Sequence, residues 1–214
     1  MMEQVGPEIL GFSFGIFLMI LSGIVYFISA IVVWNKYRKE KNELVGALLA
    51  FLLYQSLSMV FMGVEMHTMN IMYSNIAALA VFIGSCYMLK FPLSSLSRGA
   101  RNSFFFLSLI IVLSVFSWFM LTEERQMALM IFTLWYDLVI NGIIVGGFML
   151  LLAFRTTEGA LKIKAYGGST GVLSCCVVAN TAMISGSIVT GALFGFIAPV
   201  IILSTLFFGY KSQN

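Results

Sequence analysis

Long apolar segments separated by short polar ones dominate the pattern of the chain. Seven apolar segments are long enough for a helix that crosses the ~30 Å hydrocarbon core of a membrane. They fall at about 10–34, 44–64, 71–93, 103–121, 127–154, 171–190 and 191–210. The last two come from one stretch that is too long for one crossing at ~1.5 Å per residue, and we place the turn at 184–191. We predict a single all-α domain, a bundle of seven transmembrane helices over residues 1–214.

Composition supports a membrane protein and excludes a soluble one. The chain has 214 residues, of which 60% are hydrophobic and 10% are charged, whereas soluble domains carry about 25% charged residues. The amino-terminal sequence "MMEQVGPEIL" contains two acidic residues and no basic one. It lacks the positive region of a cleaved signal peptide, so we expect the first helix to be retained.

Basic residues gather on one side of the predicted membrane. Eleven of the twelve lysines and arginines fall in alternate loops or in the tail, and only Arg125 falls on the other side. Because cytoplasmic loops carry an excess of Lys and Arg, we predict an external amino terminus, a cytoplasmic carboxyl terminus and a multi-pass protein of the cell membrane. The eleven residues are Lys36, Arg38, Lys39, Lys41, Lys90, Arg98, Arg101, Arg155, Lys162, Lys164 and Lys211.

Several kinds of chemistry lack the residues that they need. His67 is the only histidine, which excludes a haem with two axial histidines and a His-rich zinc or di-iron site. All lysines lie at the cytoplasmic boundary, so a retinal Schiff base in mid-membrane is excluded as well. Cys86, Cys175 and Cys176 lie inside predicted helices, and we expect no disulfide. We therefore expect no cofactor, no metal site and no catalytic activity.

Four strongly polar side chains nevertheless lie well inside predicted helices, and the fifth helix adds two more. An ionised aspartate in mid-membrane costs at least a few kcal/mol, and no Lys or Arg lies inside a span. We therefore expect Asp137 to be neutral at rest and hydrogen-bonded to Asn141 or Gln55. It is either a proton, ion or ligand site, or a structural hydrogen-bonding residue between helices. The six candidate site residues are Gln55, Asn75, Thr133, Asp137, Asn141 and Asn180.

Small residues predict where the helices pack closely. Gly142 and Gly146 form a small-xxx-small pair. At about 100° per residue they point nearly opposite Asp137, so we expect protein on both sides of the fifth helix. Gly191 and Gly195 predict close packing of the last helix. Pro199 frees a carbonyl one turn earlier, and the resulting kink suits either a mobile hinge or static packing.

The sequence "YGGSTG", at 166–171, is rich in glycine and precedes the predicted sixth helix. It lacks the Lys-Ser/Thr pair of a phosphate-binding P-loop and follows no strand. We expect it to be the flexible start of that helix.

The segment from Leu44 to Leu96 resembles part of a known family. Its cues are a basic loop before it, a short outer turn, and a helix that ends in Phe91-Pro92. In these respects it resembles the second and third helices of the seven-helix sensor module at the amino terminus of bacterial histidine kinases. Such kinases continue into catalytic domains, whereas this sequence stops four residues after Tyr210. The resemblance implies a freestanding sensor module that signals through a partner, and it carries over no site residues.

Three functions remain open. The first is a sensor or receptor-like module that detects a small ligand or a proton in an outer polar cavity. The second is a non-catalytic accessory subunit of a larger membrane complex, and the third is a small proton- or cation-linked transporter or channel. As partners we expect membrane lipid and either a membrane protein or a second copy of the chain, but no nucleic acid.

Overall fold

Helices form almost all of the structure, a computed structural model that describes residues 8–9, 12–157 and 159–211. Two short strands, β1 (Glu8–Ile9) and β2 (Phe12–Ser13), pair antiparallel before the first helix. The fifth and sixth spans each contain a π-helical segment, η1 or η2. In chain order the helical elements are α1 (Phe14–Glu40), α2 (Glu43–Thr68), α3 (Ile71–Met88), α4 (Arg98–Phe119), α5 (Glu123–Asp137), η1 (Leu138–Gly146), α6 (Gly147–Arg155), α7 (Gly159–Leu173), η2 (Ser174–Ala179), α8 (Asn180–Ile184) and α9 (Ile188–Lys211).

Within the described residues, seven helical segments are long and apolar enough to cross a membrane, as predicted. The sixth was placed wrongly: it begins at Gly159 rather than Gly171 and ends at Ile184. Hydropathy locates the apolar part of a helix, but good helix formers such as Lys162 and Lys164 extend the helix beyond it. The turn to α9 is short, and Gly186 adopts φ +87° there.

Side-chain caps fix where four of the helices begin. In each case a side-chain oxygen accepts a hydrogen bond from a backbone N–H of the first turn, which would otherwise lack a partner. The Asn42 oxygen lies 2.8 Å from the Leu44 nitrogen at the start of α2. The other caps are Asn70 for α3, Ser97 for α4 and Thr122 for α5. Short connections rich in Asn, Ser and Thr therefore reverse the chain between spans.

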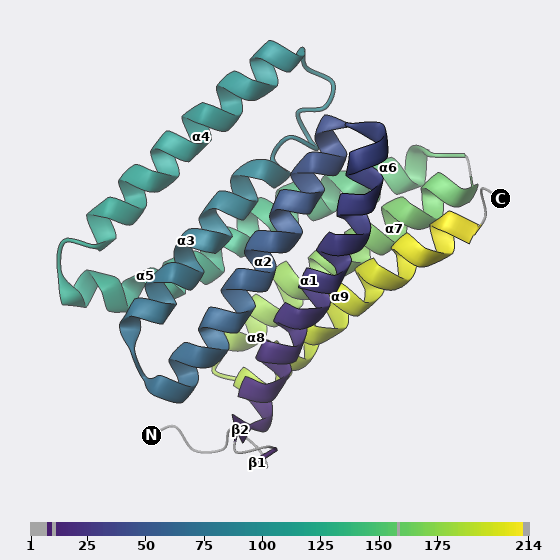
Figure 1. The fold of residues 1–214 in the computed structure, drawn as a ribbon. Helices are drawn as coiled ribbons and strands as arrows, with labels where there is room; N and C mark the ends of the chain where they lie inside the picture. Colours follow the sequence, from purple (N-terminus) through teal and green to yellow (C-terminus); the bar gives the residue numbers. More distant parts are fainter. Residues whose placement is uncertain (1–7, 10–11, 158, 212–214) are drawn as a thin grey trace.

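Six of the seven spans pack in a closed ring (Figure 1). The order around the ring is α1, α2, α3, the α5–η1–α6 span, the α7–η2–α8 span and α9, which returns to α1. Helix α4 lies outside this ring, against α3 and α5. Only Val112 and Phe119 are buried on it, whereas Phe106, Leu107 and Ile110 are more than half exposed.

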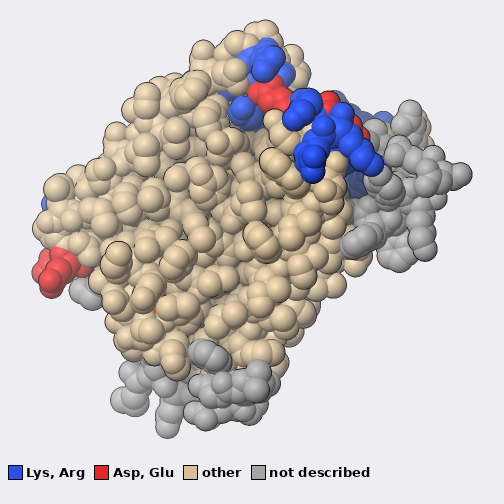
Figure 2. Space-filling view, viewed as in Figure 1, with Lys and Arg blue, Asp and Glu red and all other residues tan. Residues whose placement is uncertain are grey.

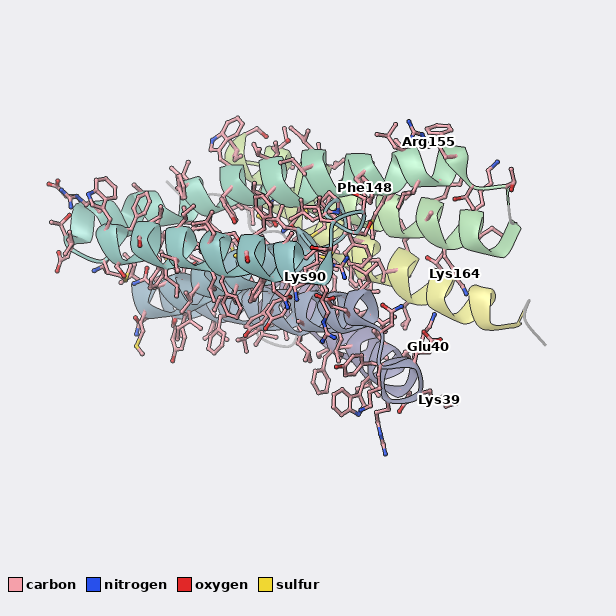
Figure 3. All side chains as sticks on the ribbon, turned by 90° about the horizontal axis from the view of Figure 1, so that it is seen from above. Lys39, Glu40, Lys90, Phe148, Arg155 and Lys164 are labelled. Atoms are coloured by element: carbon pink, nitrogen blue, oxygen red, sulfur yellow. The ribbon has the colours of Figure 1, made fainter. Side chains whose placement is uncertain are left out.

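Charged residues lie mainly at the two ends of the bundle (Figure 2). Lys39, Arg155 and Lys164, from three different spans, extend toward the same end (Figure 3). We call this end, where α1 and α9 terminate and α2 begins, the basic end. The acidic end carries Glu123 and Glu124 at the start of α5.

Spans approach each other closely at glycines, which have no side chain. A Cβ atom on Gly23 of α1 would lie 2.6 Å from Val60 of α2. The Gly23 carbonyl also accepts a 2.7 Å hydrogen bond from Ser56. On α7, a Cβ atom on Gly171 would lie 2.5 Å from Ile202 of α9. The sequence "YGGSTG" is therefore not a flexible start of a helix: it lies inside α7, where its glycines let α9 approach.

Candidate proton or ion site

Asp137 ends α5 and is the centre of a buried polar cluster. One carboxyl oxygen, Oδ1, accepts a 2.5 Å hydrogen bond from the Asn141 amide, and Oδ2 accepts a 2.8 Å bond from the Asn180 amide. The Cys176 thiol lies beside this carboxyl group. Asp137 is only 5% exposed, so protein donors replace the water that would otherwise solvate it.

The cluster joins three spans through its two asparagines. Asn141 lies one turn after Asp137, and its amide also donates to the Ser85 hydroxyl of α3 at 2.7 Å. Asn180 begins α8, and its amide also donates to the Leu134 carbonyl at 3.3 Å. The predicted Asp137–Asn141 contact is therefore present. Asn180 lies one turn from the end of its span, not at the middle, because that span begins at Gly159 and already ends at Ile184.

A small cavity borders Asp137 inside the ring. It lies between α2, α3, α5 and α8, and about 20 Å³ of it is open to the centre of a water molecule. That volume holds one or two waters. Its polar lining consists of Gln55, Ser58, Ser74, Thr133, Asp137 and Asn180.

Gln55 is the part of the lining that lacks a partner. It is 2% exposed, and its side-chain Nε2 forms no hydrogen bond in the structure. A buried amide without a partner costs about 1–3 kcal/mol. The predicted Gln55–Asp137 hydrogen bond is absent: both residues line the cavity instead.

Two predicted site residues have other local contacts. The Thr133 hydroxyl donates to the Leu129 carbonyl at 2.7 Å, although Thr133 also lines the cavity. The Asn75 amide lies 3.5 Å from the Gln126 side-chain oxygen, across the α3–α5 contact. Asn75 is thus outside the Asp137 cluster, and we withdraw it from the site.

The two π-helical segments pack against each other beside Asp137. A Cβ atom on Gly142 of η1 would lie 2.6 Å from Val177 of η2, and one on Gly146 would lie 3.1 Å from Leu173. Both glycines pack closely against a neighbouring span, as predicted. The prediction that they point away from Asp137 is wrong. A π-helix bonds residue i to i+5, which brings Gly142 onto the face of Asp137. Both residues contact the same neighbouring span.

The opposite face of η1 is open. Ile143 is 58% exposed, and Val139 and Ile144 are exposed as well. The expectation that protein encloses the fifth span on both sides is therefore wrong. A face rich in Val and Ile suits contact with lipid.

Of the two glycines predicted to pack closely in the last span, Gly191 leaves no room for a side chain and Gly195 does. A Cβ atom on Gly191 would lie 2.5 Å from Met183, whereas Gly195 faces Met59 at an ordinary 3.7 Å. Pro199 lies inside α9 and leaves the Gly195 carbonyl without an N–H partner. The Ser22 hydroxyl of α1 donates to that carbonyl at 2.8 Å. This bond favours static packing, and a hinge at Pro199 stays a prediction.

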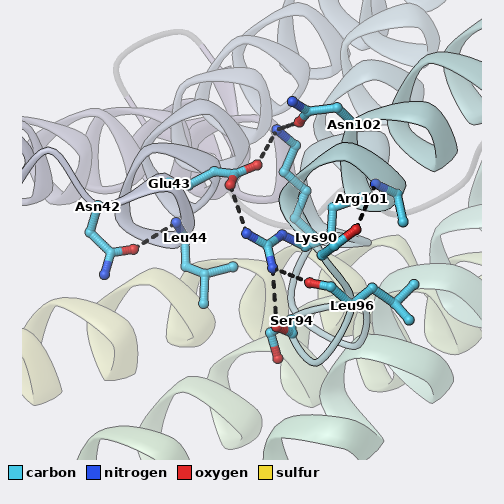
Figure 4. Close-up of polar contacts among 10 residues, drawn as sticks. Asn42, Glu43, Leu44, Lys90, Ser94, Leu96, Arg101 and Asn102 are labelled. Carbon is cyan, nitrogen blue, oxygen red and sulfur yellow. Dashed lines mark hydrogen bonds and ion pairs between the residues drawn. The ribbon is translucent and has the colours of Figure 1, made fainter.

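An ion-pair cluster at the basic end was not predicted (Figure 4). Glu43, the first residue of α2, lies 3.0 Å from Lys90 and 2.9 Å from Arg101. Arg101 also donates to the carbonyls of Ser94 and Leu96. The number of basic residues in a loop indicates the orientation of the protein in the membrane. It does not show which of these residues form ion pairs.

In the part of the chain that the structure describes, no three His, Cys, Asp or Glu side chains gather where they could hold a metal ion. The chemistry available at Asp137 is therefore hydrogen bonding, protonation, or binding of a cation through mostly neutral oxygens.

Comparisons with known proteins found no protein-family model, no curated protein and no solved structure that matches this chain. The resemblance to a histidine kinase sensor module consequently stays a prediction.

Proposed function

We propose that the protein is a multi-pass sensor module of the cell membrane, without catalytic activity, that responds to the occupancy or protonation of the Asp137 cavity. The observation that carries this proposal is a buried carboxyl group beside a water-sized cavity at the junction of two π-helical segments. π-Helical segments are rare and frequently occur at functional sites. The size of the cavity limits the stimulus to a proton, a water molecule or a monatomic ion.

The contacts around Asp137 connect it with spans that extend to the basic end. Asn180 connects α5 with α8, and the Ser169 hydroxyl of α7 donates to the Gly146 carbonyl of η1 at 3.0 Å. A change in charge at Asp137 acts on both sides of the η1–η2 contact. The spans that contain these segments continue to Arg155 and Lys164 at the basic end, which we assign to the cytoplasm.

Hydrogen–deuterium exchange tests this proposal in purified protein reconstituted in lipid. We expect exchange of α6 and α7 near the basic end, corrected for intrinsic rates, to change between about pH 5 and pH 7.5. Asp137→Asn should remove the change, since an amide does not titrate. Cys176, Tyr26 and Tyr136 are titratable groups that interact electrostatically with Asp137, and thiols and phenols ordinarily titrate above pH ~8.

A matched control separates the site from other carboxyl groups. Glu65→Gln removes a carboxyl group near the acidic end, outside the cavity lining, and should leave the pH-dependent change intact. If the same change persists in Asp137→Asn, or if none occurs in the wild type, the sensor proposal is wrong.

The position of α4 favours a second candidate, an accessory subunit of a membrane complex. Ile110 on α4 is 62% exposed and lies outside the ring of six spans. A photo-crosslinking residue at Ile110 should capture a stoichiometric membrane protein in native membranes. The same residue at Ile143, which is exposed on η1, should not. Lipid adducts alone at both positions would count against a subunit role.

A further inference from the structure

Asp137 accepts hydrogen bonds at both of its carboxyl oxygens, as an ionised carboxylate does. Oδ1 accepts from the Asn141 amide and Oδ2 from the Asn180 amide. A protonated carboxyl group must donate its own hydrogen to an acceptor. The arrangement therefore accommodates negative charge, and the neutral state expected from the sequence stays a prediction.

A buried carboxylate needs a positive countercharge, and the chain supplies none nearby. The salt bridges of Glu40 and Glu43 lie at the basic end, and the hydrogen-bond donors to Asp137 are two neutral amides. A charge at this depth costs at least a few kcal/mol when it is unpaired. A cation from solution can remove that cost only if there is room for it beside the carboxylate.

The cavity provides that room and the appropriate ligand atoms. It borders Asp137, and its volume of about 20 Å³ suits one small ion. Hard cations bind to carboxylate, amide and hydroxyl oxygens, and the lining offers those of Ser58, Thr133 and Gln55. Gln55 also lines the cavity, and the oxygen of its amide is the atom that can bind a cation.

We propose that the cavity is a monovalent cation site that binds Na⁺ in preference to K⁺, with Asp137 as the charged ligand and with Ser58, Thr133 and Gln55 as neutral ligands. One carboxylate balances one positive charge, whereas Ca²⁺ sites use 6–8 oxygens, often from several carboxylates. The small volume favours the smaller alkali ion. This assignment rests on the proposed function and names the occupant that the sensor would detect.

Thermal unfolding of the full chain in detergent tests the site. Wild-type protein is compared in NaCl, KCl and N-methyl-D-glucamine chloride at one pH and one ionic strength. We expect Na⁺ to raise Tm by about 3–5 °C at ten times its Kd relative to N-methyl-D-glucamine, with a saturable concentration dependence. K⁺ should produce a smaller rise. Equal Tm values in the three salts would overturn the proposal, as would a larger rise with K⁺.

Substitutions locate the bound ion. Asp137→Asn should reduce the Na⁺-dependent rise to less than about 1 °C, since the charged ligand is lost. Ser58→Ala and Thr133→Val each remove one neutral ligand and should raise the apparent Kd for Na⁺ about tenfold. Asn75→Ala, outside the cavity lining, should leave it unchanged. If Asp137→Asn fails to fold, an unaltered Na⁺ response in both Ser58→Ala and Thr133→Val still contradicts the site.

The two proposals fail separately. A pH-dependent change in exchange at the basic end without any effect of Na⁺ on Tm would refute the cation site and keep the sensor. A Na⁺-dependent Tm without any change at the basic end would keep the site and refute the sensor.

Discussion

At the residue scale, the Ser22 hydroxyl compensates for a proline in another helix. Pro199 has no N–H to donate to the Gly195 carbonyl, and Ser22 of α1 donates to it instead. One buried hydroxyl thus satisfies a backbone group and connects the first span to the last.

This compensation predicts a coupled pair of substitutions. Ser22→Ala should lower the free energy of unfolding by about 0.6–1 kcal/mol, as expected for a hydrogen bond between transmembrane helices. In a Pro199→Ala background the restored N–H satisfies the carbonyl, so the same substitution should cost less. A double-mutant cycle in mixed detergent micelles measures the coupling. Equal costs in the two backgrounds would show that the Ser22 bond does not compensate for Pro199.

Gly142 predicts a steric effect at the η1–η2 contact. Gly142→Ala places a Cβ atom 2.6 Å from Val177, and overpacking of this kind costs about 1–3 kcal/mol. Val177→Ala should relieve part of that loss. Gly147→Ala is the matched control, since a Cβ atom there meets nothing within 4 Å and alanine favours a helix. Melting temperatures of the three single variants and of the Gly142→Ala/Val177→Ala double variant test the prediction. It fails if Gly142→Ala is as stable as Gly147→Ala.

The sequence predicts part of this site and not the rest. The i, i+4 spacing of Asp137 and Asn141 follows from helix geometry alone, so their contact was predictable. The contact between Asn141 and Ser85 depends on how two spans rotate relative to each other, and hydropathy carries little information about rotation. The free amide of Gln55 and the cavity depend on side-chain packing across α2, α3 and α5.

At the scale of elements, the π-helical segments explain why the prediction for the fifth span failed. A constant 100° per residue separates Gly142 from Asp137, whereas the wider π turn brings them onto one face. The number of spans was predictable because it depends only on apolar length. The residues at which the spans begin and end were less predictable, since α7 begins in a polar sequence.

The ion pairs of Glu43 predict how α4 is held at the basic end. Glu43→Gln removes both pairs, and the side chains of Glu43, Lys90 and Arg101 are each less than one quarter exposed. We expect a loss of about 1–3 kcal/mol and faster hydrogen exchange in residues 89–102. Glu40→Gln breaks only an exposed pair with Lys36 and should cost less than about 0.5 kcal/mol. Similar exchange in both variants would contradict this role.

At the scale of the whole molecule, the distribution of charge predicts orientation. The basic end carries the ends of α1 and α9, so a reporter fused after Asn214 should be cytoplasmic and one fused before Met1 external. Paired reporters of the phosphatase and fluorescent-protein type measure this in cells. The reverse pattern would also move the Asp137 cavity to the cytoplasmic half of the membrane.

The contact between α1 and α9, which closes the ring, has a consequence for biosynthesis. Ser22 and Gly195 are 173 residues apart, and α9 is synthesised after the other six spans of the bundle. While a chain is still on the ribosome, its first five or six spans form an open arc, and α1 exposes the serine that will later meet α9. The ring therefore closes only after translation of α9, and until then the insertion machinery or surrounding lipid must shield that edge.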